Sequence, residues 1–325
     1  MKPVNWGVLG AARFAREHMA RAIHEAEGAR LFALATSDPS RAHGFQAFCP
    51  DLIVHDSYDA LLADPRVEAV YIPLPNSLHV EWTLKAIRAG KHVLTEKPIA
   101  MRADEIDELI RARDSSGLLV AEAYMIVHHP QWQRVRGLIA DGAIGRILHA
   151  DAHFTYDNRA DPTNIRNRPE TGGGSIPDIG VYTYGCLRWA AQAEPVALRA
   201  TIRHENGVDV FAQVTGRMAG DSGEFTFHAM TSMRLFPRQE VVFQGERGLI
   251  RLTAPFNAGV FGEAQVQMYR KGQADHIERF PGVRQYRNQV EAFVRSLRDG
   301  TPYPWTLEDA RGTQSMIDQV VASAL

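Results

Sequence analysis

Two different patterns of apolar and polar positions divide the chain. From residue 4 to about 122, short apolar runs alternate with amphipathic stretches such as 77–89 and 102–113. This alternation predicts a parallel sheet with helices on both faces and right-handed crossovers. The expected strands are 4–10, 29–36, 52–55, 67–73, 91–95 and 118–123.

After about residue 124, extended runs follow one another directly, joined by glycine-containing turns such as "HENGVD". This pattern predicts an α+β region with a large, mostly antiparallel open sheet. One face of such a sheet needs a cover, which favours a homo-oligomer, a dimer or tetramer, formed through that face. Helices are expected at 131–140, 176–191, 283–298 and 306–323, and strands at 147–156, 196–204, 208–218, 223–231, 239–245, 248–253 and 264–270.

The composition is that of an ordinary globular protein. Of the 325 residues, 45% are hydrophobic and 23% are charged, with a formal net charge of -2, so a nucleic-acid or membrane partner is not expected. The two cysteines, Cys49 and Cys186, lack metal-ligand spacing and fit a reducing compartment. No apolar run is long enough to span a membrane and no signal peptide is recognisable, so we expect a cytoplasmic protein.

A nucleotide-binding turn follows the first strand. The segment Gly10-Ala11-Ala12-Arg13-Phe14-Ala15 has the dinucleotide pattern G-x-G-x-x-G/A with its second glycine replaced by Ala12. Gly10 permits the tight turn, and the start of the following helix offers unpaired N–H groups to a pyrophosphate. A tight turn without a ligand is the alternative. The residues expected to contact the cofactor here are Gly10, Ala12, Arg13 and Phe14.

The end of the second strand selects the cofactor. An acid at this point favours NAD, whereas a hydroxyl and an arginine favour NADP. Ser37 and Arg41 lie at the exit, with Asp38 one residue late, so the sequence weakly favours NADP over NAD. Asp38 could equally cap the next helix.

Strands four and five end in "YIPLPNSLH" and "TEKPIA", and their carboxyl ends meet at one edge of a parallel sheet. We expect Pro73, Asn76 and Glu96 to contact the cofactor there. His79 is a further candidate, with a half-buried histidine on the helix face as the alternative. Lys97 brings an ammonium to the mouth of the sheet.

Together the segments "GVLGAARFA", "YIPLPNSLHVEWTLKAIRAGKHVLTEKPIA", "AEAYMIVHHPQW", "GAIGRILHADAHF" and "ETGGGSIPDIGVY" resemble the glucose-fructose oxidoreductase, inositol dehydrogenase and rhizopine catabolism (Gfo/Idh/MocA) family. The resemblance runs from about residue 4 to the carboxyl terminus. The segment "DPTNIRNRPETGGG" with Tyr182 is similar to the D-xylose dehydrogenase and dihydrodiol dehydrogenase branch. We therefore expect a dinucleotide-binding domain at 1–123 and a substrate-binding and oligomerisation domain at 124–325, with C-terminal helices packing back on the first.

The resemblance implies that Lys97 and Tyr182 are catalytic and that the Lys97–Pro98 bond is cis. Tyr182 would exchange the hydroxyl proton, while Lys97 stabilises the phenolate. Asp178, four residues before Tyr182 on one helix, would position the substrate or share the proton. Without the resemblance, this pair is equally compatible with packing.

The substrate contacts expected are Asn164, Arg166 and Tyr124, although the 164–166 segment could instead brace its loop. Val127 stands where this branch commonly has a basic residue, which puts D-xylose itself in question. The adjacent His128 and His129 lack ligand spacing, and we expect no metal site.

These features predict an NAD(P)-dependent oxidoreductase that transfers hydride between nicotinamide and a sugar or polyol hydroxyl or carbonyl group, with a small carbohydrate-like substrate. Two alternatives remain. The same residues could serve a trans-dihydrodiol or anhydro-ketose, or the chain could be a non-catalytic NAD(P)-sensing regulator.

Overall fold

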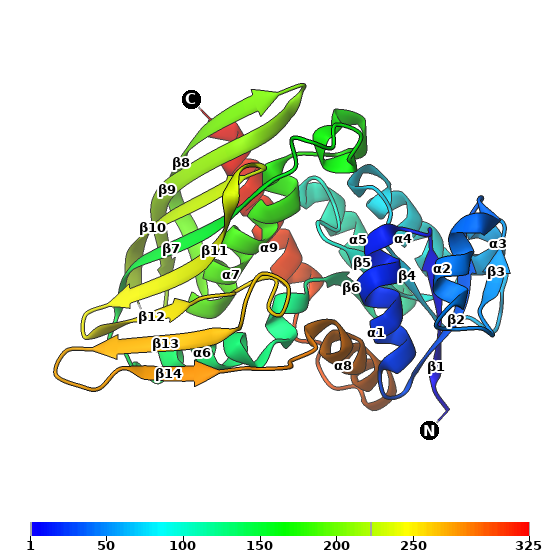
Figure 1. The fold of residues 1–325 in the computed structure, drawn as a ribbon, viewed down its shortest axis with the longest axis horizontal. Coiled ribbons are helices and arrows are strands. Elements are labelled where there is room, and N and C mark those ends of the chain that lie inside the picture. Colours follow the sequence, from blue (N-terminus) through cyan, green and yellow to red (C-terminus); the bar gives the residue numbers. More distant parts are fainter. Residues whose placement is uncertain (1, 222, 325) are drawn as a thin grey trace. The chain divides into compact units, whose positions relative to one another are not determined.

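The computed structural model describes residues 2–221 and 223–324, which form two compact units. The first unit contains the chain up to Ala100 together with Asp104–His128 and Arg284–Ala310. The second contains Met101–Ala103, His129–Val283 and the residues from Arg311 onward. Each unit is built around its own sheet (Figure 1). No helix of the described residues is both long and apolar enough to cross a membrane.

The first unit confirms the predicted doubly wound parallel sheet, with strand order β3-β2-β1-β4-β5-β6. The order reverses between β1 and β4, which is where ligands bind in open sheets of this kind. All six residues of β1 are buried, as expected for a parallel strand covered on both faces. The strands are β1 (Val4–Leu9), β2 (Ala29–Ala35), β3 (Ile53–His55), β4 (Ala69–Ile72), β5 (His92–Glu96) and β6 (Val120–Ala123).

Helices cover this sheet, and one of them comes from a distant part of the sequence. In α8, Phe293 packs against Trp6 of β1 with ring centroids 4.9 Å apart. The helical segments of this unit are η1 (Ala15–Met19), α1 (Ala20–Glu25), η2 (Pro39–Ala42), α2 (His43–Gln46), α3 (Tyr58–Ala63), η3 (Asn76–Leu78), α4 (His79–Arg88), α5 (Ala103–Ser116), η4 (Met125–His128) and α8 (Gln285–Asp299).

The second unit has an eight-stranded sheet in the order β14-β13-β12-β11-β7-β10-β9-β8. Neighbouring strands are antiparallel, except that β7 and β10 run parallel. The predicted mostly antiparallel sheet is thereby confirmed, with β14 as an unanticipated edge strand. The strands are β7 (Ile147–Asp157), β8 (Ala193–Glu205), β9 (Val208–Gly220), β10 (Gly223–Ser232), β11 (Arg234–Gly245), β12 (Gly248–Leu252), β13 (Gln265–Arg270) and β14 (His276–Arg279).

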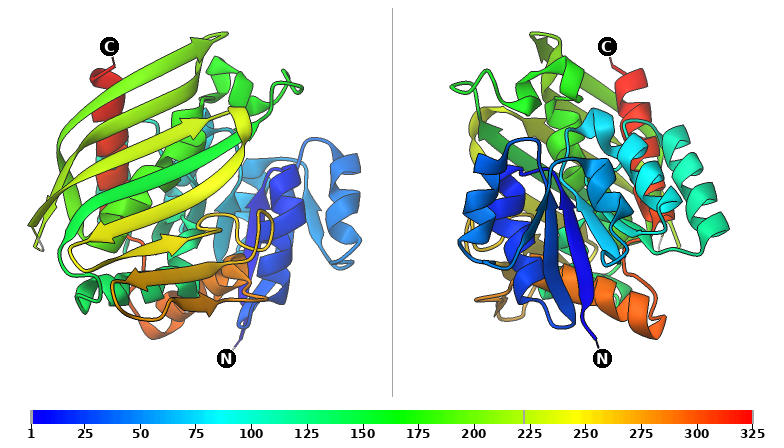
Figure 2. Two further views of the ribbon diagram at one scale, coloured as in Figure 1. Left: turned by 60° about the vertical axis from the view of Figure 1, so that its left-hand side comes forward. Right: turned by 90° about the vertical axis from the view of Figure 1, so that its right-hand side faces the viewer.

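One face of this sheet is covered by helices and the other is not (Figure 2, left). The helices α6 (Pro130–Ala140) and α7 (Val181–Ala191) lie behind the sheet in that view, and α9 (Leu307–Ala322) ends the chain. Residues of β9 and β10 alternate between buried and more exposed positions, as a half-covered sheet requires. Self-association through the uncovered face stays a prediction.

The helix expected at 176–191 has two parts. Ile176–Gly180 is a π-helical turn, and α7 follows from Val181 to Ala191. Ser175, which precedes the helix, makes no capping bond of its own. Its hydroxyl donates to Asp209, and Oδ2 of Asp209 accepts the Ile176 N–H at 2.8 Å. A carboxylate from β9 therefore fixes the start of this helix.

Candidate functional site

The predicted nucleotide turn lies at the carboxyl end of β1. Gly10 has a φ of 98°, a left-handed conformation that favours glycine, and its N–H donates to the Ala35 carbonyl at 2.9 Å. The chain becomes helical from residue 13, and Ala15 is fully buried where the helix meets the sheet. The exposed Arg13 pairs with Glu17, and the Phe14 ring packs against Tyr286.

The acid after β2 acts as a helix cap. Asp38 caps the η2 helix by accepting hydrogen bonds from the Ser40 N–H at 3.0 Å and the Ser40 hydroxyl at 2.6 Å. Ser37 and Arg41 are exposed, and Nη2 of Arg41 donates to the Ala11 carbonyl at 2.8 Å. Arg41 of η2 is thus tied to the glycine turn that follows β1.

His79 occupies a different position from the one predicted. It is fully buried, with Nε2 2.8 Å from the Leu74 carbonyl and Nδ1 2.7 Å from the Pro98 carbonyl. Burial lowers the pKa of His79 to about 4, so the ring is neutral and donates from one nitrogen only. Both nitrogens face protein carbonyls, and the cofactor contact expected of His79 stays a prediction. The ring connects the loops after β4 and β5.

The same edge of the sheet carries Pro73 and Asn76 after β4, and Glu96 and Lys97 at the end of β5. Pro73 is buried, whereas Asn76, Glu96 and Lys97 are partly exposed. The Lys97–Pro98 bond is cis, as the family resemblance implies. Oε1 of Glu96 accepts a 2.6 Å hydrogen bond from the Tyr71 hydroxyl, which orients the acid beside Lys97.

A buried acid supports this loop from behind. Glu122 of β6 accepts the Ile99 N–H at 2.9 Å on Oε1 and the Trp305 Nε1–H at 2.8 Å on Oε2. Burial raises the pKa of Glu122 to about 7. The apolar run around this residue gave no sign of the role, because its partners lie 23 and 183 residues away.

Tyr124, expected to contact substrate, is fully buried in the first unit, and its ring stacks on Trp305 with centroids 4.1 Å apart. The substrate contact expected of Tyr124 stays a prediction, and the described structure shows the side chain in a packing role. Val127 is also fully buried.

In the second unit, Asp178 is the centre of a hydrogen-bonded cluster. Its Oδ2 accepts the Tyr156 hydroxyl at 2.6 Å and lies 2.9 Å from Nε of Arg166. The carboxylate beside Arg166 raises the pKa of that guanidinium above its ordinary value, and burial raises the pKa of Tyr156. Sequence reasoning identified Asp178 and Arg166 but missed Tyr156, which arrives from β7.

Tyr182 lies one turn after Asp178 and is 6% exposed. Its ring packs against Phe154 and Phe256, with centroids 5.9 and 5.7 Å away. Asn164 makes hydrogen bonds within its own loop, as the bracing role would require. Its Oδ1 accepts the Arg166 N–H at 3.1 Å, and its Nδ2 donates to Asp161. Asn164 thereby shapes the loop that carries Arg166.

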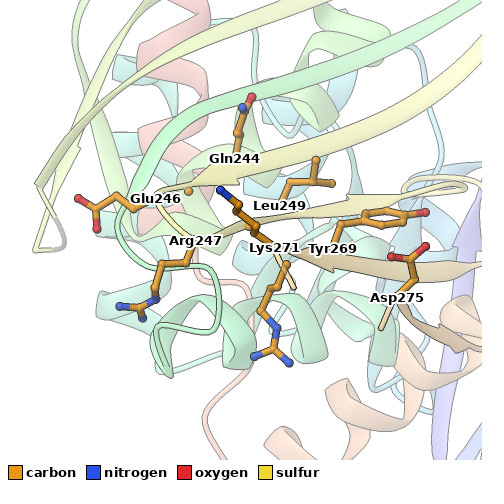
Figure 3. Close-up of a pocket in the computed structure, with 10 residues that line it drawn as sticks. Gln244, Glu246, Arg247, Leu249, Tyr269, Lys271 and Asp275 are labelled. Carbon is orange, nitrogen blue, oxygen red and sulfur yellow. The ribbon is translucent and has the colours of Figure 1, made fainter. Parts of the chain in front are cut away.

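A separate hollow lies at the ends of β11, β12 and β13 (Figure 3). Its exposed side chains include both signs of charge, among them Glu246, Arg247 and Lys271. None of the predicted site residues lines it, and Glu246 is paired with Arg146 at 3.2 Å. This hollow belongs to the hairpin turns and adds nothing to the candidate site.

The residues at the carboxyl edge of the parallel sheet fit a dinucleotide. The left-handed turn at Gly10 leads directly into a helix, whose first N–H groups suit a pyrophosphate. Beside it, the capped Asp38 leaves the hydroxyl of Ser37 and the guanidinium of Arg41 at the exit of β2. Such donors suit an anionic group on the adenosine ribose.

Comparison with known proteins likewise indicates a protein that binds a dinucleotide. Residues 4–124 match the model of an oxidoreductase family with an NAD-binding Rossmann fold, and residues 132–251 match the GFO/IDH/MocA C-terminal domain. The chain is 34% identical to a dTDP-3,4-didehydro-2,6-dideoxy-alpha-D-glucose 3-reductase of Saccharopolyspora spinosa, over 98% of this chain and 95% of that protein.

Two further relatives are informative. The chain is 29% identical to a D-xylose 1-dehydrogenase (NADP(+)) of Haloferax volcanii, over 98% of this chain and 97% of that one. It also superimposes on a 3-ketoreductase from Actinomadura kijaniata, solved in complex with NADP and TDP-benzene, with a TM-score of 0.89 and 30% identity. That match covers 99% of this chain and 98% of the other.

Proposed function

Since the chain belongs to the Gfo/Idh/MocA family of NAD(P)-dependent oxidoreductases, we propose that it interconverts a hydroxyl and a carbonyl group on a sugar, with NADP as its preferred cofactor. The first candidate substrate is a keto sugar carried on a nucleotide.

The proposed catalytic group is Tyr182, which gives a proton to the carbonyl oxygen in reduction and takes it back in oxidation. Proton transfer by a positioned side chain contributes roughly 100-fold to 10,000-fold to a rate. A bound nicotinamide supplies or accepts the hydride. Lys97 stabilises the developing negative charge with its ammonium group.

Asp178 has a positioning role in this proposal. Its carboxylate is held by Tyr156 and Arg166, so it presents a fixed acceptor one turn before Tyr182. Arg166 is partly exposed and retains guanidinium N–H groups that can donate to sugar or phosphate oxygens. Tyr124 and Asn164 are left out of the substrate contacts, because the first packs on Trp305 and the second braces its loop.

The preference for NADP rests on the exit of β2. Asp38 is engaged as a helix cap, while the exposed Arg41 is anchored beside the glycine turn. Glu96, Pro73, Asn76 and the Gly10 turn supply the other proposed cofactor contacts, and His79 positions their loops. The Actinomadura kijaniata 3-ketoreductase was solved in complex with NADP, and the Haloferax volcanii relative is an NADP(+) D-xylose 1-dehydrogenase.

The proposed substrate differs from those of the D-xylose and dihydrodiol dehydrogenases. Identity is 34% to a dTDP-sugar 3-reductase and 29% to a D-xylose dehydrogenase, each over nearly the full chain. The buried, apolar Val127 replaces the basic residue common in the xylose branch. Both observations support a nucleotide-linked keto sugar over a free aldose.

The observation that carries the proposal is the Asp178 cluster, because it holds a fixed carboxylate on the helix that bears Tyr182 and brings the guanidinium of Arg166 to it from the preceding loop. The test is turnover with purified protein across nucleotide-linked keto sugars, free aldoses, cyclitols and trans-dihydrodiols, with both cofactors. Highest kcat/KM on a nucleotide-linked sugar with NADPH is expected. Highest activity on a free aldose or dihydrodiol would show that the proposed substrate class is wrong. Tight NADPH binding without turnover would favour a non-catalytic regulator.

A further inference from the structure

Three potential metal ligands meet on the sheet of the second unit: Asp151 and His153 of β7 and His228 of β10. Asp151 and His153 are two residues apart in one strand, so their side chains share a face. His228 is paired in register with Asp151 in the parallel β7–β10 pair and therefore points to the same face. Their buried neighbours Ala150 and Ala152 point to the opposite face.

The three donor atoms all lie within 4.8 Å of one another. Nε2 of His153 lies 3.1 Å from Nδ1 of His228, which lies 3.5 Å from Oδ1 of Asp151. With bonds of about 2.0–2.1 Å to a tetrahedral zinc ion, two ligand atoms are roughly 3.3–3.4 Å apart. The two observed separations lie on either side of this value.

Hydrogen bonding alone does not satisfy this arrangement. A neutral imidazole carries one proton. The 3.1 Å contact between the two imidazoles can be one hydrogen bond, but Oδ1 of Asp151 then lies 3.5 Å from Nδ1 of His228, too far for a good one. Within the described part of the chain, Nδ1 of His153 and Nε2 of His228 have no hydrogen-bond partner, so only the contact between the two rings constrains their tautomers.

From these contacts we infer that Asp151, His153 and His228 bind a divalent transition-metal ion, with zinc as the best match. Two imidazoles and one carboxylate suit zinc, and water fills the remaining coordination position. Glu240, which faces His153 from β11, is ion-paired with Arg238 and Arg251 at 2.6 Å each and is not a further ligand. The ion would connect β7 and β10, and none of its ligands belongs to the proposed catalytic residues.

The test uses the full chain without an affinity tag, freed of metal by a chelator. Zinc is titrated by calorimetry, and cobalt is added as a spectroscopic probe of coordination. We expect one zinc ion per chain, a rise in Tm with zinc, and tetrahedral cobalt absorption. The variants Asp151→Asn and His228→Gln should weaken zinc binding by at least about 10-fold. Loss of a residue that only hydrogen-bonds a metal ligand already costs about that much, and loss of a ligand should cost more.

His204→Gln is the matched control, because His204 is an exposed histidine on β8 of the same sheet. It should bind zinc like the wild type. His228 is also partly exposed, with 25% of its side chain accessible, so His228→Gln tests the site even if a variant of the more buried His153 does not fold. Equal zinc affinity in wild type and His228→Gln, or equal losses in His204→Gln and His228→Gln, would overturn the site.

Discussion

The hydroxyl of Tyr156 donates a 2.6 Å hydrogen bond to Oδ2 of Asp178, joining β7 to the π-helical turn before α7. A phenol and a carboxylate 22 residues apart thereby act as one unit with Arg166. The orientation of Asp178 depends on this contact, and the proposed positioning role depends on that orientation.

Tyr156→Phe removes the donor and leaves the ring. We expect kcat/KM to fall by about 10-fold, since a hydrogen bond to a charged group contributes about 1.5–3 kcal/mol, part of which Arg166 retains. Steady-state kinetics measures the effect. Tyr184→Phe is the control, because the buried Tyr184 hydroxyl has no hydrogen-bond partner in the described structure. Equal activity of both variants would show that the Tyr156 hydroxyl does not contribute to turnover.

Lys97→Ala should abolish turnover and leave NADPH binding nearly intact, because the ammonium acts on the reacting oxygen and the glycine turn holds the dinucleotide. Turnover and the NADPH Kd are measured on the same preparation. Lys85→Ala is the control, as Lys85 forms a 2.8 Å surface ion pair with Glu81 on α4. Parallel loss of binding and turnover would show that Lys97 mainly binds cofactor.

Tyr182→Phe should lower kcat more than it raises KM, because the missing hydroxyl acts mainly in the transition state. The ring contacts with Phe154 and Phe256 are preserved, so Tm should change little. An unchanged kcat would exclude Tyr182 as the proton-transfer group.

Glu122 makes stability depend on pH. Burial raises its pKa from 4.5 to about 7, so the folded chain binds this proton more tightly than the unfolded chain. The contribution to stability is full below about pH 4.5 and is lost as the pH rises through about 7, a difference of about 3 kcal/mol.

Urea unfolding of wild type and Glu122→Gln at pH 5 and pH 8 measures this contribution. The free energy of unfolding of the wild type, minus that of the variant, should be larger at pH 5 than at pH 8. The buried histidines change stability with pH in the opposite direction, but they are present in both proteins, so their contribution cancels in this difference. The exposed Glu246→Gln serves as a control. The same gap at both pH values would mean that Glu122 does not titrate in this range.

Arg41→Ala should raise the Kd for NADPH by about 10-fold or more and change that for NADH by less than about 3-fold, because a guanidinium contact to a phosphate is charge-assisted. Fluorescence titration with both cofactors measures the difference. Arg41→Lys keeps the charge and should recover part of the NADPH affinity. Equal weakening for both cofactors would mean that Arg41 only supports the turn through Ala11.

Most strands and helices could be predicted from the local pattern of apolar and polar residues, because that pattern repeats differently in a strand and in a helix. The strands of the parallel sheet, the turn at Gly10 and the cis Lys97–Pro98 bond all came from short segments or the family resemblance. The sequence could not show that Asp38 is taken up as a cap, because an acid after a strand suits a ribose hydroxyl equally well.

Contacts between distant segments were not predictable. Tyr156 meets Asp178, and Glu122 meets Trp305, only through tertiary packing. Asp151, His153 and His228 come together because β7 and β10 pair in parallel, whereas the alternating pattern indicated antiparallel neighbours. The full burial of His79 and Tyr124 was also not visible in the sequence, because it depends on segments that are distant along the chain.

The most direct test of hydride transfer to a sugar follows deuterium from the reduced cofactor. NADPH deuterated at the transferred position of nicotinamide C4 is incubated with the protein and the nucleotide-linked keto sugar, and the product is examined by NMR and mass spectrometry. We expect one deuterium per product molecule, on the new carbinol carbon, and none with Lys97→Ala. A product without deuterium, or the same yield from Lys97→Ala, would contradict this expectation.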